Sequence, residues 1–255
     1  MGTTRENGSL YTRVENKVAT VEFGHPASNS FVAELLDRLT NELDKLSENQ
    51  EISVIVLKSE GDRAFCAGAS FNELMAVSSL EEGKVFFSGF ANVINAMRNC
   101  KKIIIGRVQG KTVGGGVGLA SACDYVFASE NAAVRLSELS IGIAPLVIAP
   151  AVERKIGKAA LAELSLSPTE WKNAYWAKEK GLFAKVFGSL KELDKELEFF
   201  THKLSAYNPD ALTEWKKILW EGTAHWENLL IERAEVTGTL VLSEFTKNAL
   251  SKFKK

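Results

Sequence analysis

Three consecutive glycines, residues 114–116, lie between an apolar run at residues 103–108 and a segment of one leucine and three small residues at 119–122. The apolar run predicts a buried strand, and the small residues are able to form a helix. Glycines have no Cβ, so they allow backbone conformations and close approaches that other residues forbid. A helix that begins here presents free N–H groups and the positive end of its dipole. The stretch therefore predicts a site for an oxygen that carries or develops negative charge.

Other interpretations of the glycine run stay open at this point. A P-loop is disfavoured because the Lys-Ser/Thr pair that ends such a loop is missing. The spacing of Gly114, Gly116 and Gly118 also differs from the dinucleotide-binding pattern, which places two residues between its last two glycines. Close packing of a helix on a strand, without any chemistry, explains the run as well.

Glu138 is the candidate acid or base of the chain, because Leu136, Leu139 and Ile141 flank it with apolar side chains. Burial in such surroundings favours the neutral carboxylic acid and raises its pKa towards neutrality. A carboxyl group with that pKa accepts and returns a proton at working pH. The alternative is an ordinary solvated carboxylate in a loop.

Two further segments decide between these interpretations. Residues 60–71, Glu-Gly-Asp-Arg-Ala-Phe-Cys-Ala-Gly-Ala-Ser-Phe, follow a second apolar run at residues 54–57. Residues 137–145 read Ser-Glu-Leu-Ser-Ile-Gly-Ile-Ala-Pro. Together with the glycine run, in this order and spacing, these segments resemble the crotonase family of enoyl-CoA hydratases and isomerases. The resemblance extends over residues 10–187.

This resemblance implies an α/β fold, a crotonase-like spiral of repeated β-β-α units with a C-terminal helical subdomain. We therefore expect a core with the CoA-thioester site at residues 1–190, and a helical subdomain at residues 191–255 that covers the site and supports oligomerisation. The implied assembly is a homotrimer or a dimer of trimers. Five side chains fit subunit packing, although packing within one subunit explains them as well: Trp215, Trp220, Trp226, Leu229 and Leu230.

The resemblance also implies roles for individual residues. The backbone N–H groups of Ala69 and Gly115 would hold the oxygen of a thioester enolate, and Glu138 would transfer the proton. The implied partner is an acyl-CoA small-molecule substrate, so CoA is part of the substrate, and no separate cofactor or metal is expected. The positions that match the family's thioester and CoA site are Ala27, Ser28, Ala67, Gly68, Ala69, Gly114, Gly115 and Gly118.

Two positions depart from the family pattern. Typical hydratases carry a second glutamate three residues after the middle glycine, where this chain has Gly118. Two carboxylates share the proton transfers of water addition, whereas one is enough to move a proton from the α-carbon to the γ-carbon. The sequence therefore favours enoyl-CoA double-bond isomerisation. The alternatives are hydration, including that of a branched or carboxylated substrate such as methylglutaconyl-CoA, and CoA-thioester binding without catalysis. Ser70 replaces the usual aspartate, which leaves a local contact unexplained.

Composition and charge indicate the class of protein. The chain has 255 residues, 45% of them hydrophobic, which suits one large domain or one domain with an appendage. A net charge of −1 disfavours nucleic acid or an acidic membrane as the main partner, although Lys247, Lys252 or Lys254 could meet a CoA phosphate. Cys66 and Cys123 are expected to be buried small hydrophobes. Three cysteines without metal-binding spacing, no secretory signal and no apolar span predict a cytoplasmic, reducing location and no membrane partner.

The remaining pattern predicts the elements that position these residues. Residues 10–15 and 18–23 predict a β-hairpin, and leucines at helical spacing predict a helix that Ser30 caps and that ends near residue 49. A helix over residues 80–100 is expected to place Val85 in the core. The other expected elements are strands at 53–58, 124–128, 133–136 and near 187, a helical pair at 147–166 broken at Gly157, a helix starting at Ser167, and helices from 189 onward with a break at 208–210.

Overall fold

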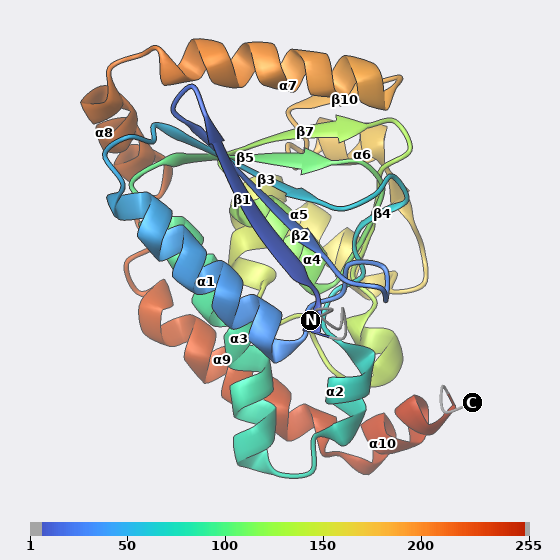
Figure 1. Ribbon diagram of the computed structural model, residues 1–255. Coiled ribbons are helices and arrows are strands. Elements are labelled where there is room, and N and C mark those ends of the chain that lie inside the picture. Colours follow the sequence, from blue (N-terminus) through green and yellow to red (C-terminus); the bar gives the residue numbers. More distant parts are fainter. Residues whose placement is uncertain (1–6, 253–255) are drawn as a thin grey trace, which may run out of the picture.

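The computed structural model describes residues 7–252, which form two β-sheets surrounded by helices (Figure 1). The larger sheet has six strands in the spatial order β1, β2, β3, β5, β7, β10, and the smaller has four in the order β4, β6, β8, β9. The strands are β1 (Ser9–Glu15), β2 (Val18–Gly24), β3 (Val54–Ser59), β4 (Ala64–Cys66), β5 (Ile103–Val108), β6 (Lys111–Val113), β7 (Tyr125–Ser129), β8 (Ala133–Arg135), β9 (Lys172–Asn173) and β10 (Lys185–Phe187).

The larger sheet begins with the hairpin that the sequence predicts. Glu15 of β1 pairs with Val18 of β2, so the turn between them has two residues, Asn16 and Lys17. Both have positive φ, 50° and 64°, which is the turn geometry that matches the right-handed twist of antiparallel strands. From β2 onward all neighbouring strands of this sheet are parallel, so helices must connect them.

The parallel strands are buried on both faces of the larger sheet. Leu57 of β3 belongs to the main core, which the helices on one face complete. Val56, its neighbour on the same strand, packs on the opposite face with Leu193 and Leu197. This alternation explains why the strands read as apolar runs in the sequence. The main core contains residues of α1 (Ala33–Glu48), α3 (Leu80–Asn99), α4 (Gly115–Ala122) and α5 (Ala149–Leu166), and the opposite face is covered by α7 (Leu190–Ser205).

The smaller sheet directs three loops to one place. Its strands β4, β6 and β8 are parallel to one another, so their carboxyl ends lie at the same edge. The residues that follow these ends are Ala67, within the first motif at 60–71, Gly114, which begins the glycine run, and Leu136, which directly precedes the motif at 137–145. The sheet therefore brings together segments that are far apart in the chain.

Of the helices that follow α7, α9 (Trp226–Val241) and α10 (Glu244–Ser251) lie near this edge, α9 also packs against α3, and α8 (Pro209–Leu219) lies against the larger sheet. Figure 1 shows α9 beside α3, and the two helices approach so closely that a Cβ on Gly83 would lie 2.8 Å from Cα of Gly238. None of the helices within residues 7–252 combines the length and the apolar character that a membrane span requires. The division of the chain at residue 190 stays a prediction.

Four local expectations prove wrong or incomplete. Ser30 does not cap α1, which has Val32 at its N-cap position without a side-chain hydrogen bond. No helix starts at Ser167, because α6 (Ala174–Glu179) begins later, with Asn173 as its cap. Val85 is 60% exposed rather than in the core. The short helix α2 (Phe71–Ala76) was not expected.

The position of Ser70 explains one departure from the family pattern. Ser70 is the N-cap of α2, and its hydroxyl accepts a hydrogen bond from the Glu73 amide at 3.4 Å. Serine and aspartate both cap helices in this way, so the exchange preserves the contact.

A buried ion pair fastens α8 to the larger sheet. The carboxylate of Asp124 accepts hydrogen bonds from Lys216 Nζ, Trp220 Nε1 and the Ile104 amide, each at 2.7 Å. The side chains of Asp124 and Lys216 are 2% and 3% exposed. Trp220 and Trp226 are likewise buried in this subunit, whereas Trp215 is 58% exposed.

We expect Asp124→Asn to lower the free energy of unfolding by about 3–5 kcal/mol, because it leaves the buried ammonium of Lys216 without its partner. Denaturant unfolding at neutral pH measures this change. Glu214→Gln is the matched control, since the Glu214–Lys217 pair on the same helix is exposed and should contribute at most about 1 kcal/mol. Equal stability of the two variants would show that the buried pair does not hold α8.

Candidate active site

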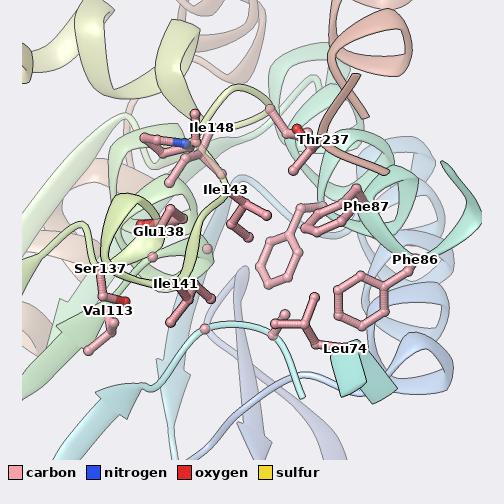
Figure 2. Close-up of a pocket in the computed structure, with 18 of the residues that line it drawn as sticks. Leu74, Phe86, Phe87, Val113, Ser137, Glu138, Ile141, Ile143, Ile148 and Thr237 are labelled. Atoms are coloured by element: carbon pink, nitrogen blue, oxygen red, sulfur yellow. The ribbon is translucent and has the colours of Figure 1, made fainter. Parts of the chain in front are cut away.

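A cavity of about 130 Å³ lies at the edge where the strands of the smaller sheet end. Figure 2 shows Ser137 and Glu138 on one side of it, with Leu74 and Phe86 opposite. Its wall is mostly apolar, and the side chains that form it are Phe71, Leu74, Phe86, Phe87, Phe90, Val113, Ile141, Ile143, Ala144, Pro145, Val147 and Ile148, with the polar Ser137, Glu138 and Thr237.

Two backbone amides at the cavity are free to donate. Ala69 forms a parallel bridge with Phe31, in which the Phe31 amide donates to the Gly68 carbonyl and the Ser70 amide donates to the Phe31 carbonyl. This pattern leaves the N–H of Ala69 itself unused. Gly115 is the first residue of α4, so its N–H has no partner inside the helix. Within residues 7–252 neither amide donates a backbone hydrogen bond, and both residues line the cavity.

The loop that carries one of these amides requires glycine. Gly114 has φ +53°, and a Cβ there would lie 2.8 Å from Oε1 of Glu138. A Cβ on Gly115 would overlap the ring of Phe90. The glycines therefore permit a sharp turn and the close approach of two side chains to the backbone.

Glu138 begins a short 3-10 helix, η2 (Glu138–Ile141), directly after the third strand of the smaller sheet. Although the residue as a whole is half-buried, Oε2 is buried and has no hydrogen-bond partner among the described residues. Burial raises the pKa of Glu138 to about 7, against the opposing effects of a backbone hydrogen bond of the residue and of the positive charge on Arg135. A carboxyl group with this pKa is poised to accept and release a proton near neutral pH.

Most of the residues predicted for the site meet in this cavity. Its lining includes Ala67, Gly68, Ala69, Gly114, Gly115 and Glu138. Ala27 and Ser28 lie outside the lining and are exposed, but the Ser28 carbonyl accepts a hydrogen bond from the Ala67 amide at 3.1 Å. The loop before α1 is thus continuous with the rim of the cavity.

Gly118 was predicted to belong to the thioester site, but it does not line the cavity, and a side chain of another element fills the space beside it. A Cβ on Gly118 would overlap Cγ2 of Ile148 and would lie 3.7 Å from Cδ1 of Ile94. Ile148 precedes the first turn of α5 and itself lines the cavity. The sequence pointed to the missing carboxylate, but it gave no sign that an isoleucine from another element fills the space.

Several other site residues were also missed. Phe90 comes from α3 and Thr237 from α9, and no local motif marks either of them. Lys247 and Lys252 are exposed at and beyond α10, whereas Lys254 lies outside the described residues, so a contact with CoA phosphate stays a prediction. Cys66 and Cys123 are fully buried, which raises the pKa of each thiol to about 12 and confirms them as small hydrophobes. The described part of the chain contains no cluster of side chains suited to a metal ion.

Comparison with known proteins identifies the family. The enoyl-CoA hydratase/isomerase family model matches residues 13–251. A peroxisomal protein of Arabidopsis thaliana named Delta(3,5)-Delta(2,4)-dienoyl-CoA isomerase is 31% identical, over 69% of this chain and 67% of its own. A Bacillus subtilis protein named "Probable enoyl-CoA hydratase" is 26% identical, over 94% and 93%.

A solved structure confirms the predicted fold. The crystal structure of enoyl-CoA hydratase from Bacillus halodurans superposes with a TM-score of 0.88, covering 95% of this chain and 99% of that one, at 20% identity. The two sheets and the C-terminal helices are therefore the crotonase arrangement that the motifs predicted. The chain is an enzyme of the enoyl-CoA hydratase/isomerase family.

Proposed function

We propose that the protein is an enoyl-CoA double-bond isomerase in which a single carboxylate moves the proton. In this proposal the amides of Ala69 and Gly115 hold the thioester oxygen of the acyl-CoA. Their hydrogen bonds stabilise the negative charge that forms on that oxygen when the α- or γ-proton leaves. Glu138 accepts the proton at one carbon and returns it at the other, so the double bond migrates without gain or loss of atoms.

The observation that carries the proposal is the solitary carboxylate. Among the residues that the structure describes, Glu138 is the one titratable side chain lining the cavity. Its unpartnered Oε2 leaves the base free for a substrate carbon. Migration of a double bond needs one such group, because the proton removed is the proton returned.

The filled space at Gly118 also disfavours hydration. Water addition requires a place where a water molecule is held and deprotonated, and such a place needs polar partners. The methyl groups of Ile148 occupy the position beside Gly118, so the wall there is apolar.

The lining indicates the class of acyl group. No lysine, arginine or histidine within residues 7–252 lines the cavity, so a carboxylated acyl group would be buried without a counter-charge. This disfavours a methylglutaconyl-type substrate, although a human protein named methylglutaconyl-CoA hydratase is 35% identical over 46% of the chain. The cavity volume of about 130 Å³ is similar to that of an engineered cavity of roughly 150 Å³ that binds benzene. We propose an uncharged hydrocarbon chain, with about six carbons enclosed.

A panel of thioesters tests the proposal. Purified protein is incubated with 2-enoyl-, 3-enoyl- and 3,5-dienoyl-CoA of several chain lengths, and with methylglutaconyl-CoA, and the products are separated by chromatography. We expect the two monoenoyl positions to interconvert and methylglutaconyl-CoA to remain unchanged. Formation of 3-hydroxyacyl-CoA as the main product would instead establish a hydratase. Tight thioester binding without turnover would establish a binding protein.

A paired substitution tests the role of the space at Gly118. We expect Gly118→Glu/Ile148→Ala to raise the ratio of hydration to isomerisation by about ten- to a hundredfold, because it adds a second carboxylate and removes the side chain that blocks it. Both rates are measured on the same 2-enoyl-CoA.

Ile148→Ala is the matched control, since it opens the space without adding a carboxylate and should leave the ratio unchanged. Gly118→Glu alone is expected to unfold at lower temperature, because its side chain overlaps Ile148. An unchanged ratio in a folded double variant would show that water is handled elsewhere.

Assembly as a homotrimer or a dimer of trimers is part of the proposal. Of the side chains expected to pack subunits, Trp220, Trp226 and Leu230 are buried within this subunit. Trp215 and Ile218 are large apolar residues of α8 that are exposed and are therefore available to another subunit. Sedimentation velocity gives the mass of the assembly in solution.

A further inference from the structure

The positive charge of Arg135 lowers the pKa of the Glu138 carboxyl group, against the larger effect of burial. Arg135 is the last residue of β8 and precedes Glu138 by three positions. Its guanidinium carbon lies 4.5 Å from the centre of the Trp171 ring. Its Nε is buried and has no hydrogen-bond partner among the described residues. An aromatic face, rather than a carboxylate, thus receives this cation.

The backbone of Arg135 contacts the other half of the site. Its carbonyl accepts a hydrogen bond from the Gly114 amide at 3.0 Å. Gly114 is the residue with φ +53° that precedes the free amide of Gly115. One residue is therefore linked to both the oxyanion turn and the acid–base group.

The other charged groups near these elements are engaged or exposed. On α9, Arg233 donates to the Leu146 carbonyl at 3.2 Å, and on α2 the Glu73 carboxylate accepts from the Ala33 amide at 2.9 Å. Lys111 on β6 is exposed, with its Nζ 5.1 Å from the Trp171 ring. On α10, Glu244 and Lys247 are exposed. At the start of α5, Glu153 pairs with Lys158. The next two residues are also engaged, because Arg154 donates to the Leu219 carbonyl and Lys155 donates to the Asp124 carbonyl.

We propose that Arg135, stacked on Trp171, is a positioning residue for proton transfer: its charge favours the carboxylate form of Glu138 at neutral pH, and its carbonyl fixes the Gly114 turn. This inference rests on the proposed function only in taking Glu138 as the base. The stacking explains why the cation does not pair directly with the carboxylate. A direct ion pair would occupy Oε2, whereas a charge held at Trp171 leaves that oxygen free for the substrate.

The pH dependence of catalysis tests this role. The acid limb of kcat/KM reports the pKa of Glu138 in the free enzyme, since only the carboxylate accepts a proton. Removing a nearby positive charge disfavours the carboxylate, so Arg135→Gln should move the limb upward by about one pH unit. Above the limb, activity should stay within a few-fold of wild type. Arg135→Lys keeps the charge and should move the limb less.

Lys111→Gln is the matched control, because it removes a cation from the same aromatic ring without touching the Gly114 turn. Its limb should coincide with that of wild type. If Arg135→Gln does not fold, Trp171→Leu provides the second variant, because loss of the stacking frees the guanidinium to pair with the Glu138 carboxylate and should move the limb downward. A limb that stays in place while the plateau falls would show that Arg135 is merely structural and would overturn the proposal.

A readout without turnover separates this proposal from the proposed function. The infrared C=O band of protonated Glu138, assigned by its loss in Glu138→Gln, is titrated in wild type and in Arg135→Gln. A higher midpoint in the variant supports the role of Arg135 even if the thioester panel reveals no isomerase. Equal midpoints would overturn it even if the isomerase is confirmed.

Discussion

Glu138→Gln is expected to lower kcat by about two to four powers of ten, the range that positioned general acid–base groups contribute. No other titratable side chain among residues 7–252 lines the cavity, so no neighbour is available to replace the base. The amide has the shape of the carboxylic acid, so the dissociation constant of the thioester should change only a few-fold. Steady-state kinetics and equilibrium binding on the same preparation measure the two effects.

The pH profiles provide the control for this substitution. Wild-type kcat/KM should fall below a pH of about 7, because burial raises the pKa of Glu138 to that value and protonation removes the base. The residual activity of Glu138→Gln should lack this limb. Full activity in the variant, or an unchanged limb, would remove Glu138 from the mechanism.

Although Glu138→Gln should lower activity, it should raise the free energy of unfolding at neutral pH. Between the ordinary glutamate pKa of 4.5 and about 7, folded Glu138 binds a proton that the unfolded chain has lost. Stability therefore falls as pH rises through this window, and the penalty persists above it. Glu138→Gln lacks the penalty, so the variant should gain stability over wild type as pH rises.

Gly115→Ala is expected to lower kcat by about two to three powers of ten, the cost of losing one oxyanion donor. Its Cβ would overlap the ring of Phe90, so either the amide or the ring must move. In the proposed mechanism the amide stabilises the charge that develops during reaction, so kcat should fall more than substrate affinity. Single-turnover rates and thioester binding separate the two effects.

A second substitution tests whether the overlap of the added Cβ with the Phe90 ring causes the loss of kcat. Gly115→Ala/Phe90→Leu makes room for the added methyl group and should recover part of the lost kcat. Phe90→Leu alone shows what the smaller side chain costs by itself. If Gly115→Ala folds normally and keeps full activity, the thioester oxygen is bound elsewhere.

The sequence predicted the elements wherever a local pattern determines them. The hairpin and the break in α5 at Gly157 are confirmed, because positive φ at Asn16, Lys17 and Gly157 reflects short-range backbone preferences. Of the two wrong helix starts, one has a local cause and the other a tertiary cause. The Ser30 hydroxyl lies 3.3 Å from the His25 ring instead of capping α1. After Ser167 the chain forms β9, whose Lys172 pairs with Val134 of the smaller sheet.

The residues that line the cavity also fall into two groups, those that a local motif marks and those that only the tertiary fold brings there. Gly115 and Glu138 were predicted from short motifs, and both line the cavity because the three parallel strands bring the motifs to one edge. Ile148 and Thr237 were not found, because they reach the cavity from elements that no motif connects to it. Gly118 was predicted to lie at the site although Ile148 covers it, since a sequence does not state which side chain lies opposite a glycine.

The contact of α9 with α3 has a consequence for the order in which this enzyme matures during translation. A nascent chain that has emerged only as far as α8 already contains Ala69, Gly115 and Glu138, but it lacks the wall that Thr237 supplies. Docking at Gly83 and Gly238 joins distant parts of the chain, and such non-local contacts form slowly. Catalytic competence should therefore appear late, after the strands have assembled, and thioester binding by ribosome-bound chains would report the arrival of α9.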